Sequence, residues 1–221
     1  MEENEIKIGT QTWTSKNLDV ESYRNGDEIP QVKDKEEWAN LTTGAWCYYK
    51  NKTANGKKYG KLYNWYAVND PRGLAPKGYH IPTDAEWTML TDYLGGDSIA
   101  GKKMKSSTGW GWQNIAHVKE MKSRIGFKPD PGYANVGTNA SGFAGRPGGN
   151  RGSNTIGDFG FWWSSSEGVD EEMPAEVVTS DEVEMSHPRN AWSRRLEYND
   201  ADVDRYVYSK VSGLSVRCIK D

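Results

Sequence analysis

Residues 191–212 have the sequence AWSRRLEYNDADVDRYVYSKVS, the most regular pattern in this chain of 221 residues. Before Asn199-Asp200, apolar side chains such as Trp192 and Leu196 alternate with polar ones. At Asn199-Asp200 the alternation shifts by one residue. From there on, polar and aromatic side chains occupy the even-numbered positions, as Tyr206 does. Because strand side chains alternate between faces, this pattern predicts a β-hairpin that turns near Asn199-Asp200. We expect one face to pack and the other to present polar and aromatic groups to solvent.

The clearest helix is predicted to begin at Thr83. Thr83 as N-cap and Glu86 three residues later form a capping box, and Gly95-Gly96 ends the helix. The apolar residues that follow the cap at helical spacing are Trp87, Leu90 and Leu94. Shorter helices are predicted over residues 98–106 and 33–41.

Several short segments are predicted as strands, because apolar and aromatic residues in them are bounded by turn residues. They are residues 6–13, 44–49, 160–166 and 214–219. The lysine-rich stretch 50–61 contains Asn55-Gly56, which predicts a hairpin turn. Residues 109–152 are rich in glycine and predicted to be mostly loop. Scattered strands and a few helices predict a single α+β domain over residues 1–221.

Composition excludes several classes of protein. The net charge of −3 argues against a nucleic-acid-binding protein, which usually carries a basic stripe. No apolar run is long enough to span a bilayer, so we expect no membrane insertion. The acidic, polar start is unlike a signal peptide. Cys47 and Cys218 leave two alternatives, one bridge between distant parts of the chain or two buried free thiols.

The sequence contains no pattern typical of an enzyme. The three histidines, His80, His117 and His187, are isolated, and no serine lies in a nucleophile-elbow motif. The glycine-rich residues 142–152 lack the phosphate-loop pattern and favour a structural loop. We therefore expect no catalytic residues, no cofactor and no metal site.

The solvent face of the predicted hairpin has the composition of a binding surface. Tyrosine supplies rigid contact area in antibody-like paratopes, and short polar side chains adapt around it. The alternative is an ordinary exposed strand face, and composition alone does not separate the two.

Seven stretches, taken in order, resemble the Fibrobacter succinogenes major paralogous domain family. They are residues 8–18, 44–49, 59–68, 76–87, 139–143, 160–167 and 213–218. The resemblance implies a C-type lectin-like fold, with two short helices, a twisted, mainly antiparallel sheet and long loops. Two regions depart from the family pattern, near 111–135 and 167–190, and are interpreted as insertions. The second includes residues 167–186, which hold eight acidic residues and no basic ones.

The C-terminal segment also resembles variable proteins of diversity-generating retroelements, in which adenine-directed mutagenesis rewrites certain codons. The positions that match the fixed places of that pattern are Trp192, Arg194, Leu196, Tyr198, Asn199, Ala201, Val203, Arg205, Lys210 and Gly213. The positions that match variable places are Ser193, Arg195, Glu197, Asp200, Asp202, Asp204, Tyr206, Val207, Tyr208, Ser209, Val211 and Ser212. Mutated AAY codons cannot encode Glu, Lys, Gln, Met or Trp, and of these twelve residues only Glu197 falls outside the accessible set.

These resemblances imply a receptor-type or adhesin-type binding module, displayed on a phage particle or a bacterial surface. Its partner would be a protein or a glycan on a target cell, and its variable residues would form the contact face. Tyr206 and Tyr208 are the expected anchors, and the charged residues of that face favour a basic or polar partner. One alternative is an adhesive or structural surface domain of fixed specificity. A more remote one is an oxidase of the formylglycine-generating type, for which Cys47 and Cys218 would have to meet.

Overall fold

The computed structural model describes residues 4–111, 137–153, 155–168 and 189–221. Within these residues the protein is α+β, with helices and antiparallel sheets, as the sequence predicts. The helices are α1 (Lys35–Ala39), α2 (Thr53–Tyr59), α3 (Trp65–Val68), α4 (Asp84–Tyr93) and α5 (Asp97–Met104), with a 3₁₀ turn, η2 (Tyr49–Asn51). Both expected insertions lie largely outside the described residues.

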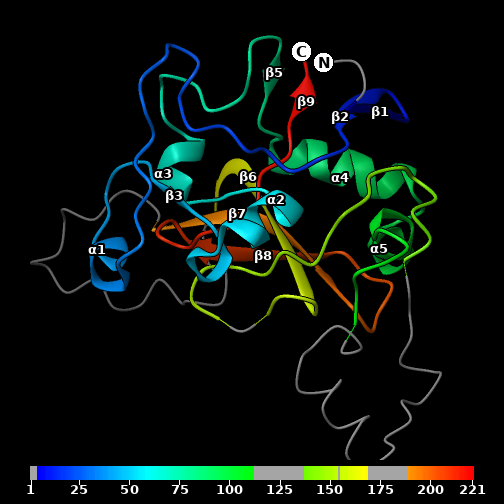
Figure 1. Cartoon of the computed structure of the whole chain (residues 1–221). Helices are drawn as coiled ribbons and strands as arrows, with labels where there is room; N and C mark the ends of the chain where they lie inside the picture. The colour runs from blue at the N-terminus through cyan, green and yellow to red at the C-terminus, as the bar shows by residue number, and fades with distance from the viewer. Residues whose placement is uncertain (1–3, 112–136, 154, 169–188) are drawn as a thin grey trace, which may run out of the picture.

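The first sheet brings distant parts of the chain together. A four-stranded sheet has the order β1 (Glu5–Ile8), β2 (Gln11–Thr14), β9 (Ile219–Lys220) and β5 (Tyr79–His80). Pairing of Trp13 with Ile219 joins β2 to the last strand, β9, so the chain ends lie close together (Figure 1). The second sheet pairs β3 (Trp46–Cys47) with β4 (Leu62–Tyr63).

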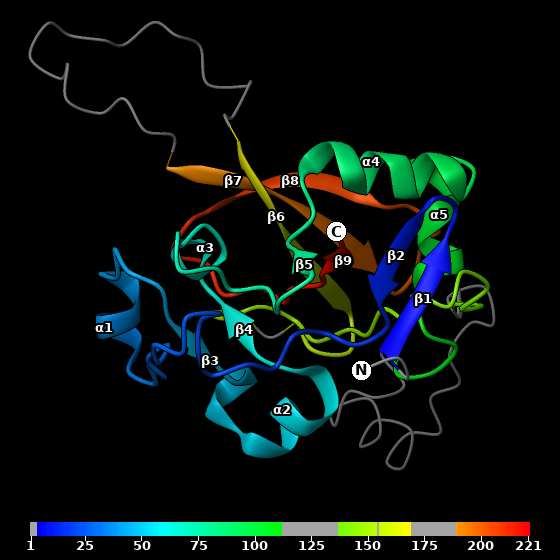
Figure 2. The ribbon, with the colours of Figure 1, turned by 90° about the horizontal axis from the view of Figure 1, so that it is seen from above.

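The third sheet contains the predicted hairpin. Its order is β6 (Phe159–Gly168), β7 (Asn190–Glu197) and β8 (Asp204–Ser209), and all neighbours are antiparallel. Helix α4 packs beside it, and the Trp87 indole donates to the Trp163 carbonyl at 3.3 Å. Figure 2 shows β7 and β8 on one side of the molecule and α2 on the opposite side.

Strand β6 divides the aromatic core. Trp162 points into a cluster with Trp13, Trp87 and Phe143, in which ring centroids lie 4.7–5.9 Å apart. Its neighbours Phe161 and Trp163 point into a second cluster, around the 0 %-exposed Tyr63. Alternation along one strand therefore supplies both halves of the core with large apolar area.

Helix α4 forms as its sequence predicts. Thr83 accepts from the Glu86 amide and Glu86 accepts from the Thr83 amide, which completes the capping box. The chain leaves the helix at Gly95 and Gly96, both with positive φ. Helix α1 lies within its predicted range, and α5 begins one residue before its predicted range of 98–106.

The hairpin turn predicted in the lysine-rich stretch is wrong. Asn55-Gly56 lies inside helix α2 and does not turn a hairpin. A Cβ on Gly56 would lie 2.1 Å from the Tyr48 ring, so this glycine is required by the close approach of Tyr48 to the helix. Packing thus overrides the local turn preference. The family resemblance implied two short helices, but the described residues also form α1, α2 and α3 besides α4 and α5.

Cys47 and Cys218 are buried free thiols, which decides between the two alternatives. They lie in different clusters of buried side chains, and burial raises the pKa of both, that of Cys218 to about 12. Thiolate formation is therefore disfavoured at either residue. Among the described residues, no group of three or more His, Cys, Asp and Glu could hold a metal ion. No helix in this part of the chain is long and apolar enough to cross a membrane.

Candidate binding surface

The β7–β8 hairpin has the predicted register. Ser193 pairs with Tyr206 and Arg195 pairs with Asp204, which centres the turn on Asn199-Asp200. Directly paired residues lie on the same face of an antiparallel sheet. Tyr208, which pairs with Ala191, shares this face, so pairing between β7 and β8 gathers five of the twelve predicted contact residues on it.

Arg195 is the centre of this face. Its Nε donates to Asp204 Oδ2 at 2.8 Å, and its guanidinium lies 4.6 Å from the ring centroid of Tyr206. The same guanidinium also lies 5.4 Å from the ring centroid of Phe159. Tyr206 remains 45 % exposed. The result is an aromatic ring held over a partly buried ion pair and open to a partner.

The second expected anchor, Tyr208, has a different environment. Its ring packs edge-on against Phe161, with centroids 5.5 Å apart, and burial raises the pKa of its hydroxyl. Tyr208 also packs against the core cluster that contains Phe161. Its ring is therefore half-buried, and of the two tyrosines Tyr206 offers more free area.

Two residues do not lie where the expected solvent face would put them. Ser193 is 0 % exposed, and its hydroxyl donates to the Tyr206 carbonyl at 3.0 Å. It is buried because Trp163, its pairing partner on β6, and Ala191 belong to the core. Val207 pairs with Trp192 and so lies on the opposite face of the hairpin. The expectation of a uniformly solvent-exposed variable face is wrong at both positions.

Acidic groups gather where the hairpin turns. Burial raises the pKa of Glu197, with a further contribution from Asp200, and burial also raises the pKa of Asp200, with Asp204 adding to it. Asp202 is exposed. Beneath the turn, Lys105 Nζ donates to the carbonyls of Glu197, at 2.7 Å, and of Asp200. The turn is thus held from below while its carboxylates favour a cationic partner.

The last predicted contact residues lie at the other end of β8. Ser209 is exposed, and Val211 and Ser212 are half-buried. The Val211 carbonyl accepts from the Trp38 indole at 2.6 Å, which fixes this segment to helix α1. The twelve residues therefore form no single patch, and the most coherent group is Glu197, Arg195, Asp204 and Tyr206.

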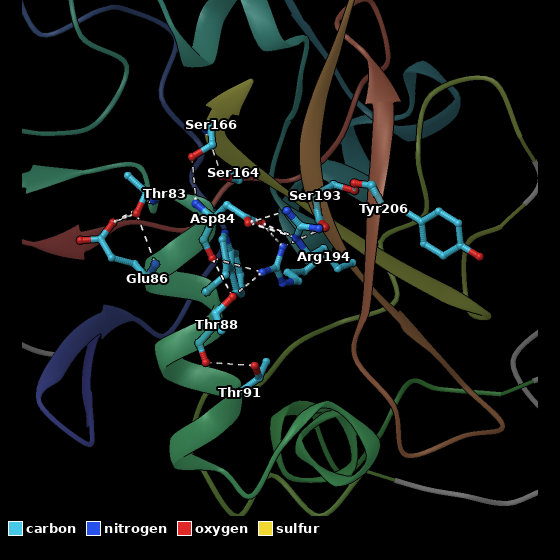
Figure 3. A network of polar contacts seen from close by, with 12 residues as sticks. Thr83, Asp84, Glu86, Thr88, Thr91, Ser164, Ser166, Ser193, Arg194 and Tyr206 are labelled. Atoms are coloured by element: carbon cyan, nitrogen blue, oxygen red, sulfur yellow. Dashed lines mark hydrogen bonds and ion pairs between the residues drawn. The ribbon is translucent and has the colours of Figure 1, made fainter. Parts of the chain in front are cut away.

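The opposite face of the hairpin is fixed to helix α4 (Figure 3). Asp84 accepts from Arg194 Nη1 at 2.6 Å and from Arg205 Nε at 3.0 Å. Burial raises the pKa of Asp84, but the two arginines outweigh it and leave that pKa below its usual value. Arg205 also lies 3.3 Å from the ring centroid of Trp192. From the sequence alone, Asp84 is only a residue in the first turn of the predicted helix. The two arginines at fixed positions, Arg194 and Arg205, were the available indication that an acidic partner binds them.

Comparison with known proteins identifies the family. The family model described as the Fibrobacter succinogenes major domain matches residues 6–220. No match is found among the curated proteins or among the solved structures. Since the match covers nearly the whole chain, the protein belongs to the Fibrobacter succinogenes major domain family.

Proposed function

We propose that this protein is a ligand-binding module of the receptor or adhesin type, whose hairpin face is diversified by a retroelement. Its scaffold would be C-type lectin-like, displayed on a phage particle or a bacterial surface. Its partner would be a protein or a glycan on a target cell. The scheme involves no catalysis, cofactor, nucleic acid or membrane insertion.

The observation that supports this proposal most is the arrangement of Tyr206 over Arg195 and Asp204. A rigid, half-exposed tyrosine above an oriented ion pair offers contact area at low entropic cost, together with directional charge. Because the backbone register sets their relative positions, replacing one of these side chains leaves the platform intact.

The division of contacts in the hairpin favours diversification. Side chains at fixed positions hold the hairpin to the rest of the fold: Arg194 and Arg205 bind Asp84, and Lys210 Nζ donates to Glu167 at 2.5 Å. Arg195, Asp204 and Tyr206, at variable positions, contact mainly one another. Such a division lets the exposed side chains change without loss of the fold.

Sequencing the 3′ end of the gene from its native population tests the proposal. Substitutions should concentrate in the codons of residues 193–212, at adenine-derived positions, while those of Arg194, Leu196 and Arg205 stay constant. The codons of residues 83–94, which encode α4 and its cap, are an internal control for the background mutation rate. Uniform sequence throughout would exclude the retroelement and leave an adhesive or structural domain of fixed specificity.

The anchor role needs a separate test, once glycan arrays or target-cell extracts have given a ligand. Tyr206→Ala should weaken binding more than Asp202→Asn or Asp204→Asn, because an exposed aromatic ring contributes more area than one carboxylate. Equal losses across these variants would refute Tyr206 as the anchor.

A further inference from the structure

A basic cleft of about 380 Å³ is lined by no residue of the hairpin. Its walls are formed by residues 15–17 and 19, by residues 56–60 at the end of helix α2, and by residues 144, 146 and 217. Figure 2 shows α2 on the side of the ribbon opposite β8. Ligand pockets commonly have volumes of roughly 300–1,000 Å³, so the cleft could hold a molecule the size of a monosaccharide.

The cleft has an excess of positive charge. Lys16, Lys57, Lys58 and Arg146 line it and are exposed. Among the described residues no carboxylate forms an ion pair with any of these four. Asp19, the one acidic residue among the described residues of the lining, is paired with Lys61 at 2.7 Å. The wall cations are therefore not neutralised by any carboxylate in the described part of the chain.

Arg217 adds a buried charge to the lining. Its side chain is 1 % exposed, and its guanidinium donates to Asn17 Oδ1 at 2.7 Å and to the carbonyls of Thr14, Phe143 and Ala144 at 2.6–3.4 Å. All these acceptors are neutral. Burial, together with repulsion from Arg146, lowers the pKa of Arg217 to about 9. A buried cation without an opposite charge is costly, and an anion in the cleft would offset that cost.

Asn17 holds this part of the cleft in place. Its Oδ1 accepts from the Trp162 indole at 2.9 Å as well as from Arg217, and its Nδ2 donates to the Tyr59 carbonyl at 2.8 Å. A side chain with these three bonds has little freedom to rotate. The buried charge is therefore presented by a pre-organised site, whereas the lysines of the wall can adjust to a ligand.

We infer that this cleft binds a phosphate or sulfate monoester carried on a molecule the size of a monosaccharide. Several cations around one cleft suit a group with three terminal oxygens and up to two negative charges better than a single carboxylate. The neutral remainder of the ligand would lie along Ser15 and the Tyr59–Gly60 segment. This site shares no residue with the hairpin surface, so it does not depend on the function proposed above.

Isothermal titration calorimetry of the full chain tests the inference, with glucose 6-phosphate, glucose 6-sulfate and glucose as probes. One or both esters should bind at a single site with an affinity that falls as NaCl is raised, and glucose should not bind. The ester that binds identifies the source of the oxyanion. Failure of both esters to bind more tightly than glucose would overturn the inference.

Charge-matched variants locate the binding. Lys57→Gln/Arg146→Gln should weaken ester binding by about tenfold or more, because it removes two cations from the wall. Lys7→Gln/Lys77→Gln removes the same charge at exposed sites outside the cleft and should leave the affinity unchanged. All four side chains are exposed, so equal melting temperatures are expected. Equal losses of affinity in the two double variants would show non-specific attraction and refute the site.

Discussion

Arg194 Nη1 lies 2.6 Å from Asp84 Oδ1, where only 2 % of the Arg194 side chain is exposed. This contact joins the first residue of α4 to the middle of β7, two segments that the sequence separates by more than a hundred residues. Because Arg205 binds the same carboxylate, one acidic side chain holds both strands of the hairpin. The exposed surface on the other face depends on this attachment for its rigidity.

Replacing Asp84 with asparagine should therefore destabilise the protein strongly. Asp84→Asn leaves the buried Arg194 charge without its partner, and breaking a buried pair in this way costs about 3 kcal/mol. Urea unfolding at pH 7 measures the loss. Asp92→Asn removes an exposed carboxylate from the same helix and should cost far less. If both variants lost the same free energy of unfolding, the network around Asp84 would not be stabilising.

Truncation of a side chain should cost much less stability on the exposed face of the hairpin than on the buried face. Tyr206→Ala removes a half-exposed ring and should cost about 1 kcal/mol or less, chiefly its contact with Arg195. Leu196→Ala empties a fully buried position and should cost about 3 kcal/mol. Chemical denaturation of both variants gives the comparison. A large loss for Tyr206→Ala would mean that this ring is structural and unsuited to replacement.

Position 193 should tolerate only small side chains, although it matches a variable place. Ser193→Tyr forces a large ring into a fully buried site beside Trp163, and overpacking of this kind costs about 2 kcal/mol. Ser209→Tyr introduces the same side chain at an exposed place on β8 and should be nearly neutral. Comparison of the melting temperatures of the two variants tests this prediction. Equal stability would show that the core around Ser193 can open to admit a larger residue.

The parts of the fold that sequence predicts correctly depend on neighbours in the chain. The capping box of Thr83 and Glu86 and the glycines after α4 are local devices, so their pattern suffices. The hairpin register is similarly determined by the parity slip at Asn199-Asp200. In both cases the residues that decide the structure are within a few positions of one another.

The errors arise where a distant residue decides the environment. The Tyr48 ring packs so closely on helix α2 that position 56 must be glycine, and Ser193 is buried because Trp163 of β6 lies beside it. The paired arginines of Asp84 also come from strands far along the chain. Alternation correctly gave the face that Ser193 shares with Tyr206, but not how much of that face the rest of the protein covers. The exposed group around Arg195 could not be identified from the hairpin alone, because strand β6 decides which side chains of that face are covered.

Lys105 should make the stability of the hairpin depend on pH. Burial lowers the pKa of its ammonium group to about 8, below the usual value near 10.5, which we take for the unfolded chain. Between these two values the unfolded chain binds a proton that the folded protein has released, so the free energy of unfolding gains a term that rises with pH. The neutral amine keeps two N–H groups for the Glu197 and Asp200 carbonyls, so the turn stays attached. Urea unfolding at several values between pH 7 and 10 should show this rise in the wild type relative to Lys105→Met. Lys77→Met, which alters an exposed lysine elsewhere in the chain, should follow the wild-type curve, and parallel curves for all three proteins would contradict the assignment.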